Sequence, residues 1–144
     1  MAFHFTNWAE ESALSHLINV VPNGTLKIAL FTNDVTPDES FVIADLVIAS
    51  GNASDPVPIS FGPVSQDAGG RAKVSAPTVL FTPSENTPQG TTAFGYALVY
   101  ADAFGILTSL LGAERFSTPV DISLGQNQVS VECTLYAKNK GGIP

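Results

Sequence analysis

The sequence contains two histidines and one cysteine that could act as a general base, a nucleophile or a metal ligand, namely His4, His16 and Cys133. Neither histidine belongs to a nucleophile elbow or to a zinc-binding HExxH pattern. His16 lies near the apolar stripe of a predicted helix, where a packing role is expected. Cys133 alternates with Val131 and Leu135 on the apolar side of a predicted strand, which favours a buried, inert thiol. The sequence therefore predicts no catalytic residue.

Carboxylates are the remaining candidates for chemistry. Asp34, Asp38 and Glu39 are close enough in the sequence to bind a hard cation through oxygen ligands. Their spacing does not match an EF-hand, and Asp34 after Asn33 is more readily explained as a turn former. A glycosidase needs two carboxyl groups across a cleft, and nothing selects such a pair among the 13 acidic residues. No glycine-rich segment is followed by the Lys-Ser/Thr of a phosphate loop, so we expect neither a metal site nor a bound cofactor.

Charge limits the classes of partner. The chain has a net charge of −7, and its six basic residues are scattered along 144 positions. Binding to the phosphate backbone of nucleic acid requires a concentrated positive surface, which only Arg71 and Lys73 approach. No apolar run reaches the roughly 18 residues of a membrane span, and no basic region before an apolar stretch predicts a secretory leader. We expect no direct contact with nucleic acid and no membrane partner.

The low content of charged residues points to buried surfaces between subunits. Only 13% of the residues are charged, against about 25% in an ordinary soluble domain. A surface poor in Lys and Glu resembles a buried interface, because charged groups are costly to desolvate. The composition therefore favours self-association, and we expect a homo-oligomer.

One amphipathic helix is predicted over residues 8–21, because four apolar side chains recur at helical spacing. Thr6 or Asn7 can cap its first turn, and the segment from Pro22 to Gly24 ends it. The four apolar residues are Leu14, Leu17, Ile18 and Val21. A single apolar stripe implies one packed face, against the sheet or against a neighbouring subunit.

From residue 24 onward the apolar pattern has the period of two that is typical of strands. Residues 93–100 and 106–116 predict a hairpin, in which Gly105 supplies the turn position that tolerates a positive φ. A strand near residues 74–81 is interrupted at Pro77, and residues 129–136 alternate most cleanly. Breaker-rich connections lie at residues 33–40, 50–58, 63–71, 83–92 and 117–128.

Short strands separated by such turns indicate an antiparallel β-sandwich of the jelly-roll or immunoglobulin-like type, with one N-terminal amphipathic helix. A parallel fold would need crossover helices, and none is predicted. A chain of this length is expected to form a single domain. We expect an N-terminal arm and helix over residues 1–24, a sandwich over 25–137 and a tail over 138–144.

Two regions of the sequence resemble a known family. LKIALFTNDVTP at residues 26–37, and FGYALVY at 94–100 with LGAERF at 111–116, are similar to segments of small tailed-bacteriophage virion structural proteins. The resemblance implies a non-enzymatic virion component, assembled in the host cytoplasm. The leading expectation is a capsid decoration or cement protein that stabilises the head, with the major capsid protein and copies of itself as partners. The alternative is a minor tail, fibre or receptor-binding module.

The two ends of the chain can extend onto a partner, so they supply the candidate interface residues. These residues are His4, Phe5, Trp8, Lys138 and Lys140. Arg115 can form a bidentate ion pair within the fold or across an interface, or it can belong to a solvated strand pair with Glu114. A glycan-active enzyme on a sandwich fold is a third hypothesis, and it would require a cleft that contains a strongly perturbed carboxylate.

Overall fold

The computed structural model describes residues 25–38, 40–50, 55–66, 68–82, 91–123 and 128–137. Within these ranges the regular structure is antiparallel β-strand, apart from the short 3-10 helix η1, Ile43–Asp45. The predicted mainly β, antiparallel character is therefore confirmed. The helix predicted over residues 8–21 lies outside the described residues.

The described chain divides into two compact units. The major unit contains the described residues of 25–59 and 78–131, and the minor unit contains those of 60–77 and from 132 onward. The expectation of a single domain stays a prediction.

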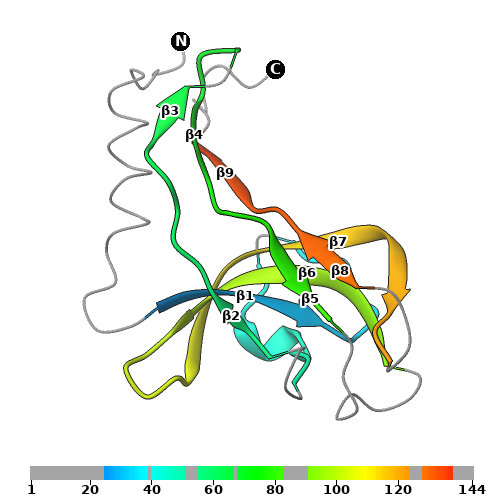
Figure 1. Cartoon of the computed structure of the whole chain (residues 1–144). Helices are drawn as coiled ribbons and strands as arrows, with labels where there is room; N and C mark the ends of the chain where they lie inside the picture. Colours follow the sequence, from blue (N-terminus) through cyan, green and yellow to red (C-terminus); the bar gives the residue numbers. More distant parts are fainter. Residues whose placement is uncertain are drawn as a thin grey trace. The chain divides into compact units, whose positions relative to one another are not determined.

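Six strands are described in the major unit: β1 (Thr25–Phe31), β2 (Val57–Pro58), β5 (Val79–Phe81), β6 (Thr92–Ala101), β7 (Leu107–Asp121) and β8 (Val129–Val131). Four of them form an antiparallel sheet in the order β2-β1-β6-β7, and β5 pairs with β8 in a second sheet (Figure 1). β1 pairs with β6 over seven consecutive positions, from Thr25 opposite Ala101 to Phe31 opposite Gly95. The long β1–β6 ladder is the centre of this unit.

Strand β1 is buried on both of its faces. Ile28 and Leu30 point to one face and Ala29 and Phe31 to the other, since successive side chains alternate, and all four have no exposed surface. The Phe31 face is covered by the segment from Val35 to Ile48, which packs on a cluster around Phe31 and Val99. Full burial of a side chain such as Phe31 stabilises the fold by about 1.5–3 kcal/mol.

The β6–β7 hairpin confirms the hairpin predicted at residues 93–116, but β7 is longer than expected. It continues to Asp121, so the first part of the predicted connection at 117–128 is strand. β6 has ten residues and β7 has fifteen, and the extra residues of β7 lie at three positions where the pairing register shifts. Thr108 and Leu111 are single extra residues, and the third shift lies in the stretch between Arg115 and Val120. These shifts are β-bulges, which bend and twist the strand that contains them.

The minor unit contains a three-stranded antiparallel sheet of β3 (Ser65–Gln66), β4 (Ala72–Ser75) and β9 (Thr134–Ala137), in the order β3-β4-β9. Ala72 and Val74 are buried on one face, with Phe61, Val64 and Leu135 packed against them. The opposite face contains Lys73 and Ser75, which lie opposite Tyr136 and Thr134 of β9.

Two predicted strands are each divided between the units. The strand near residues 74–81 is interrupted around Pro77, as predicted, into β4 and β5. The strand predicted over residues 129–136 is divided into β8, which pairs with β5, and β9, which pairs with β4. Alternation nevertheless continues through the break: Val131 and Cys133 are buried, whereas Glu132 and Thr134 are exposed. An alternating pattern therefore gives no sign that the chain changes sheet.

Candidate interaction surfaces

A rigid turn connects β6 to β7. Asp102 accepts hydrogen bonds through Oδ1 from the amides of Phe104 (2.9 Å) and Ile106 (3.0 Å). Its own amide donates to the Ile106 carbonyl, and its carbonyl accepts from the Gly105 amide. Gly105 has a φ of 79°, as predicted for this position. The Asp102 carboxylate and the positive φ of Gly105 thus fix the backbone of the turn from Phe104 to Ile106.

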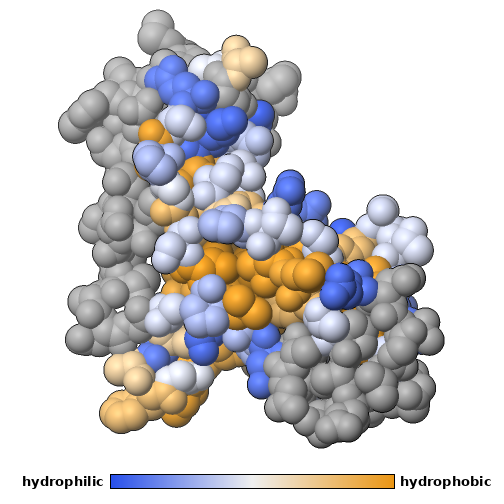
Figure 2. Space-filling view, viewed as in Figure 1, coloured by the Kyte–Doolittle hydropathy of each residue, from blue (hydrophilic) through white to orange (hydrophobic). Residues whose placement is uncertain are grey.

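This turn presents two apolar side chains to solvent. Phe104 is 89% exposed and Ile106 is 61% exposed. Figure 2 shows apolar surface at the end of the hairpin, at the lower left of the view, where Figure 1 places the β6–β7 turn. We call these two residues the hairpin tip. This surface was not predicted from the sequence, although the signal was present: an aromatic residue between a turn aspartate and a turn glycine lies at the outside of a hairpin.

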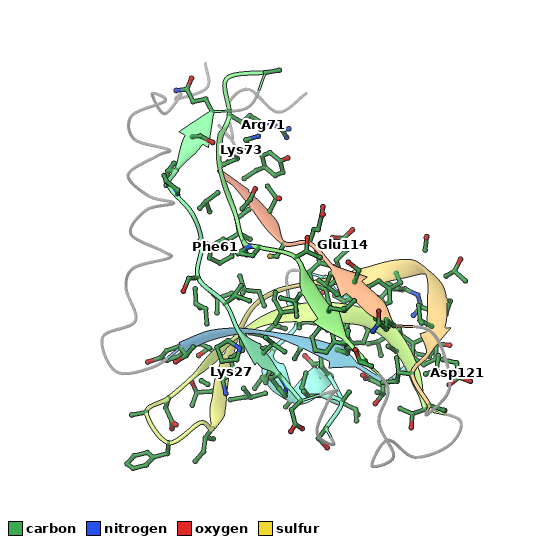
Figure 3. The ribbon with its side chains drawn as sticks, viewed as in Figure 1. Lys27, Phe61, Arg71, Lys73, Glu114 and Asp121 are labelled. Atoms are coloured by element: carbon green, nitrogen blue, oxygen red, sulfur yellow. The ribbon has the colours of Figure 1, made fainter. Side chains whose placement is uncertain are left out.

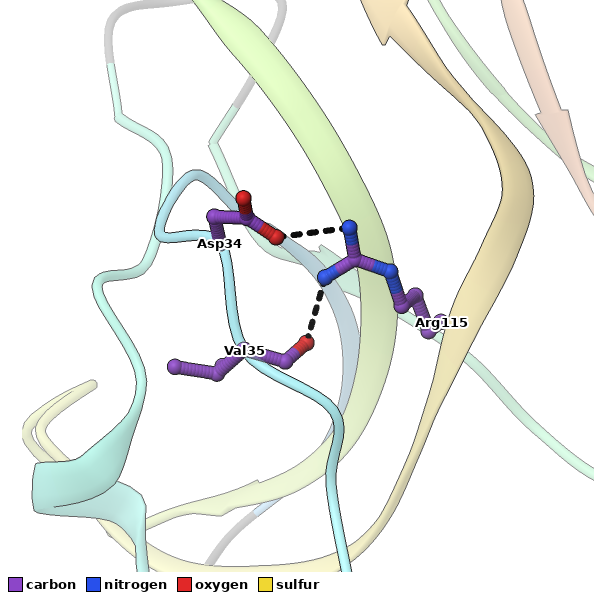
Figure 4. A network of polar contacts seen from close by, with 3 residues as sticks. All are labelled: Asp34, Val35 and Arg115. Atoms are coloured by element: carbon purple, nitrogen blue, oxygen red, sulfur yellow. Dashed lines mark hydrogen bonds and ion pairs between the residues drawn. The ribbon is translucent and has the colours of Figure 1, made fainter.

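Arg115 of strand β7 forms an ion pair and a hydrogen bond with the loop that follows β1 (Figure 4). Its Nη2 lies 2.6 Å from Asp34 Oδ1, and its Nη1 donates to the Val35 carbonyl at 2.9 Å. The guanidinium also lies 5.3 Å from the centre of the Phe94 ring. Of the alternatives that the sequence left open for Arg115, an ion pair within the fold is the one present, and only one of its two terminal nitrogens contacts the carboxylate. Its partly exposed position limits the pair to about 0.2–1 kcal/mol of stability.

The neighbouring acidic residues do not gather around a cation. Asp34 faces Arg115, whereas Asp38 accepts hydrogen bonds from the hydroxyl (2.5 Å) and the amide (2.8 Å) of Ser40. These bonds, the hydroxyl bond first, lower the pKa of Asp38 below its ordinary value. Glu39 lies outside the described residues. In the part of the chain that the structure describes, no three His, Cys, Asp or Glu side chains are grouped as metal ligands.

Asp38 lies at the edge of an open pocket of about 380 Å³ in the major unit. One wall is the loop with Asp38 and Phe41, and the other is strand β7. The remaining lining residues are Pro37, Leu110, Leu111, Gly112 and Ala113. The pocket thus combines an ionised carboxylate, an aromatic ring and aliphatic side chains, a set of groups that suits the end of a long cationic side chain.

The exposed face of the minor sheet has the opposite charge. The Arg71 guanidinium lies 4.4 Å from the centre of the Tyr136 ring, and Lys73 is opposite Tyr136 in the β4–β9 ladder. Ser75 and Thr134 are joined through their hydroxyl oxygens at 3.1 Å on the same ladder. We call the face formed by Arg71, Lys73 and Tyr136 the basic face. Figure 3 labels Lys73, which lies in strand β4, and Arg71, which directly precedes that strand.

Among the residues that sequence reasoning singled out, Cys133 is buried, as predicted, and is not part of a disulfide. His4, His16 and the five candidate interface residues at the chain ends lie outside the described residues. Within the described ranges, no helix combines the length and apolar character that a membrane crossing requires.

Comparison with known proteins leaves the chain without an assigned relative: no family model, no curated protein and no solved structure matches it.

Proposed function

We propose that this chain is a non-enzymatic virion structural protein of a tailed bacteriophage, and specifically a capsid decoration or cement protein that stabilises the head. The major capsid protein and further copies of the chain are its proposed partners. The resemblance of residues 26–37, 94–100 and 111–116 to small phage virion proteins supports the source. The hairpin tip supports an assembly role, and it is the observation that carries the proposal.

The hairpin tip has the properties of an interface anchor. Burial of Phe104 and Ile106 would contribute about 1.5–3 kcal/mol each, before the costs of association. The bonds of Asp102 to both amides hold the tip backbone in place, which reduces the ordering cost at an interface, normally about 0.5–1.5 kcal/mol for each immobilised side chain. A small anchor on each copy would be sufficient where copies also bind one another on the shell, because linked copies bind with avidity.

The fold proposed for this module is a β-sandwich in which β5 and β8 cover the Ile28 and Leu30 face of the main sheet. Ile28 and Leu30 are fully buried, and β5 and β8 bury Phe81 and Val131 on one side while exposing Leu80. The apolar faces of two sheets in one compact unit are expected to pack face to face. A jelly-roll or an immunoglobulin-like strand order would both meet this requirement.

Copy number in purified particles tests the proposal. A decoration protein should be present in an amount comparable with that of the major capsid protein, whereas a tail or receptor-binding module should be a small fraction of it. Quantitative mass spectrometry of purified particles distinguishes the two. Absence of the chain from the particles would refute both roles.

Variants of the hairpin tip test the observation behind the proposal. Phe104→Ser together with Ile106→Ser should weaken rebinding of the purified chain to particles that lack it. Val47→Ser is a matched control, since Val47 is 57% exposed but lies away from the turn. Equal binding by the tip variant and the control would remove the hairpin tip as the anchor.

A further inference from the structure

One wall of the open pocket in the major unit is formed by a β-bulge. Leu111 is an extra residue of β7 between Leu110 and Gly112, which pair with successive residues of β6. Consecutive side chains of a regular strand point to opposite faces, but a bulge re-aims a side chain. Leu110 and Leu111 accordingly both line the pocket, opposite the loop that contains Phe41. Apart from Asp38 at its edge, the pocket is lined by apolar residues and glycine, and we call it the Asp38 pocket.

The hairpin tip has the shape and chemistry to fill such a pocket. Phe104 is 89% exposed and Ile106 is 61% exposed, and both side chains are uncharged. The bonds of Asp102 to their two amides fix the turn, so insertion of the tip would cost little backbone freedom. A pocket of about 380 Å³ can accept an aromatic ring, with Ile106 at its rim. The tip and the pocket are therefore complementary surfaces of one chain.

A hairpin tip cannot enter the pocket of its own chain. Residues from Leu107 onward already belong to strand β7, which pairs with β6 and leads directly from the tip to the pocket wall at Leu110. Each strand residue advances the chain by about 3.3 Å, so the centre of the tip and the centre of that wall lie about 20 Å apart. A tip that fills an Asp38 pocket must therefore belong to a second copy.

From this complementarity we propose that two copies of the chain form a two-fold dimer, in which the hairpin tip of each copy is inserted into the Asp38 pocket of the other. The two β7 strands then run antiparallel about an axis near Thr108, which is midway between Phe104 and Gly112, so each tip lies opposite its partner's pocket. The dimer identifies the partner of the hairpin tip and rests on the proposed role of the tip as an assembly anchor. The tip then acts on particle binding through the dimer, whose two copies bind a shell with avidity.

The area that would be buried favours a reciprocal dimer over a single insertion. An aromatic side chain buries about 150–250 Å². Together with Ile106 and the pocket walls, one inserted tip would remove roughly 500–600 Å² from water. A specific interface needs at least about 1,000 Å², which one insertion does not reach and two insertions do. A head-to-tail chain of copies would have only one insertion at each interface, so the closed dimer is the favoured arrangement.

A long cationic side chain is the competing occupant of the pocket. Its ion pair with Asp38 would contribute little, because Asp38 is exposed and water screens exposed charges. Burial of Phe104 alone would raise the affinity by a factor of at least about ten. The two occupants also differ in their response to salt, since only an ion pair is weakened by screening.

Sedimentation equilibrium of the purified chain tests the dimer without particles. The wild type should form a dimer that persists as salt rises from about 50 mM to about 500 mM. Phe104→Ser together with Ile106→Ser should raise the dissociation constant at least roughly a hundredfold, because both tips of the dimer lose their apolar side chains. Val47→Ser is the matched control, since Val47 is 57% exposed but belongs to neither surface. It should change the dissociation constant by less than about threefold.

A pocket variant tests the other half of the contact. Leu111→Glu places a charge in the pocket wall and should also abolish the dimer, because an inserted tip would desolvate that charge. Leu80→Glu is its control, with the same change of charge at a side chain that is 54% exposed in β5. Mixing the tip variant with Leu111→Glu restores one intact tip and one intact pocket. The mixture should therefore form a heterodimer that is tighter than either variant with itself and weaker than the wild type, which two misfolded chains could not do.

Four outcomes would overturn the dimer: a monomer at every concentration tested, equal effects of the tip variant and Val47→Ser, no heterodimer in the mixture, or association that is lost in high salt. The last result would assign the pocket to a cationic side chain. Particle binding separates the dimer from the proposed function. A monomeric chain whose tip variant still loses particle binding refutes the second copy as the partner of the tip, whereas a dimer that is absent from particles refutes the virion role alone.

Discussion

Gly95 is the position in β6 where a single methyl group should be most damaging. It lies opposite Phe31 of β1 and Arg115 of β7 in the central sheet. A Cβ atom at this position would lie 2.5 Å from Phe31 Cε1. It would also lie well inside 3.0 Å of Phe31 Cζ and of the Glu114 carbonyl oxygen. Side-chain carbon atoms essentially never approach other atoms this closely, so Gly95→Ala requires the neighbours to move.

Neither neighbour can move cheaply. The Glu114 carbonyl belongs to the backbone of β7, and Phe31 is fully buried within the main apolar cluster. Overpacking of a core costs about 1–3 kcal/mol, and a clash with both backbone and a buried ring belongs at the upper end. We therefore expect Gly95→Ala to reduce the free energy of unfolding by about 2–3 kcal/mol, out of a total of about 5–15 kcal/mol.

Urea denaturation measures this loss, and the neighbouring strand offers a matched control. Gly112 of β7 has no atom within 4 Å of the position of an added Cβ. Gly112→Ala should therefore be neutral or stabilise the fold by up to about 1 kcal/mol, because alanine reduces the freedom of the unfolded chain. Midpoints for the two variants that agree within error would refute the close packing of Phe31 against Gly95.

Two smaller changes test local hydrogen bonds. Asp102→Ala should speed amide hydrogen exchange at Phe104 and Ile106 and lower the free energy of unfolding by about 1–2 kcal/mol. Asp102→Asn keeps an oxygen acceptor and should retain most of the protection from exchange. Unchanged exchange in the alanine variant would contradict the turn geometry. Ser40→Ala should raise the pKa of Asp38 toward 3.8, as followed by NMR titration of its carboxyl carbon. In the wild type, the Ser40 bonds to Asp38 stabilise the fold above the unfolded-state pKa, and this stabilisation is lost as the pH falls through the lower folded-state pKa. The stability of Ser40→Ala should therefore depend less on acidic pH than that of the wild type. An unchanged titration of Asp38 would exclude the Ser40 bond.

The predicted hairpin shows which parts of the fold could be derived from the sequence. Alternation specified the two strands, and the turn chemistry of Asp102 and Gly105 specified their connection, because both signals are local. The extension of β7 through Pro119 was missed, since proline normally ends a strand. An edge strand tolerates it where no neighbouring strand needs its amide, and β7 is at the edge of its sheet.

The contacts of the candidate surfaces were less accessible to sequence reasoning. For Arg115 the sequence left an ion pair and a solvated strand pair as alternatives. Its partner Asp34 is about 80 residues earlier in the chain, and alternation contains no information on such distant pairs. The strand change at Glu132 and Cys133 was hidden for a related reason. Buried and exposed positions keep their order through the break, because each half of the segment packs one face in its own unit.

The bulges of β7 also affect whether another chain could add a strand at this edge of the sheet. An exposed edge strand is a template on which another chain can add a strand, and edge-to-edge addition of this kind leads to fibres. A new strand would need an even spacing of amides and carbonyls along β7, and the extra residues at Thr108, Leu111 and beyond Arg115 break that spacing. The same irregularity that lengthens β7 therefore protects a charge-poor protein from aggregating through its backbone. The contacts proposed between copies would then depend on side chains, whose pairing can be specific and reversible.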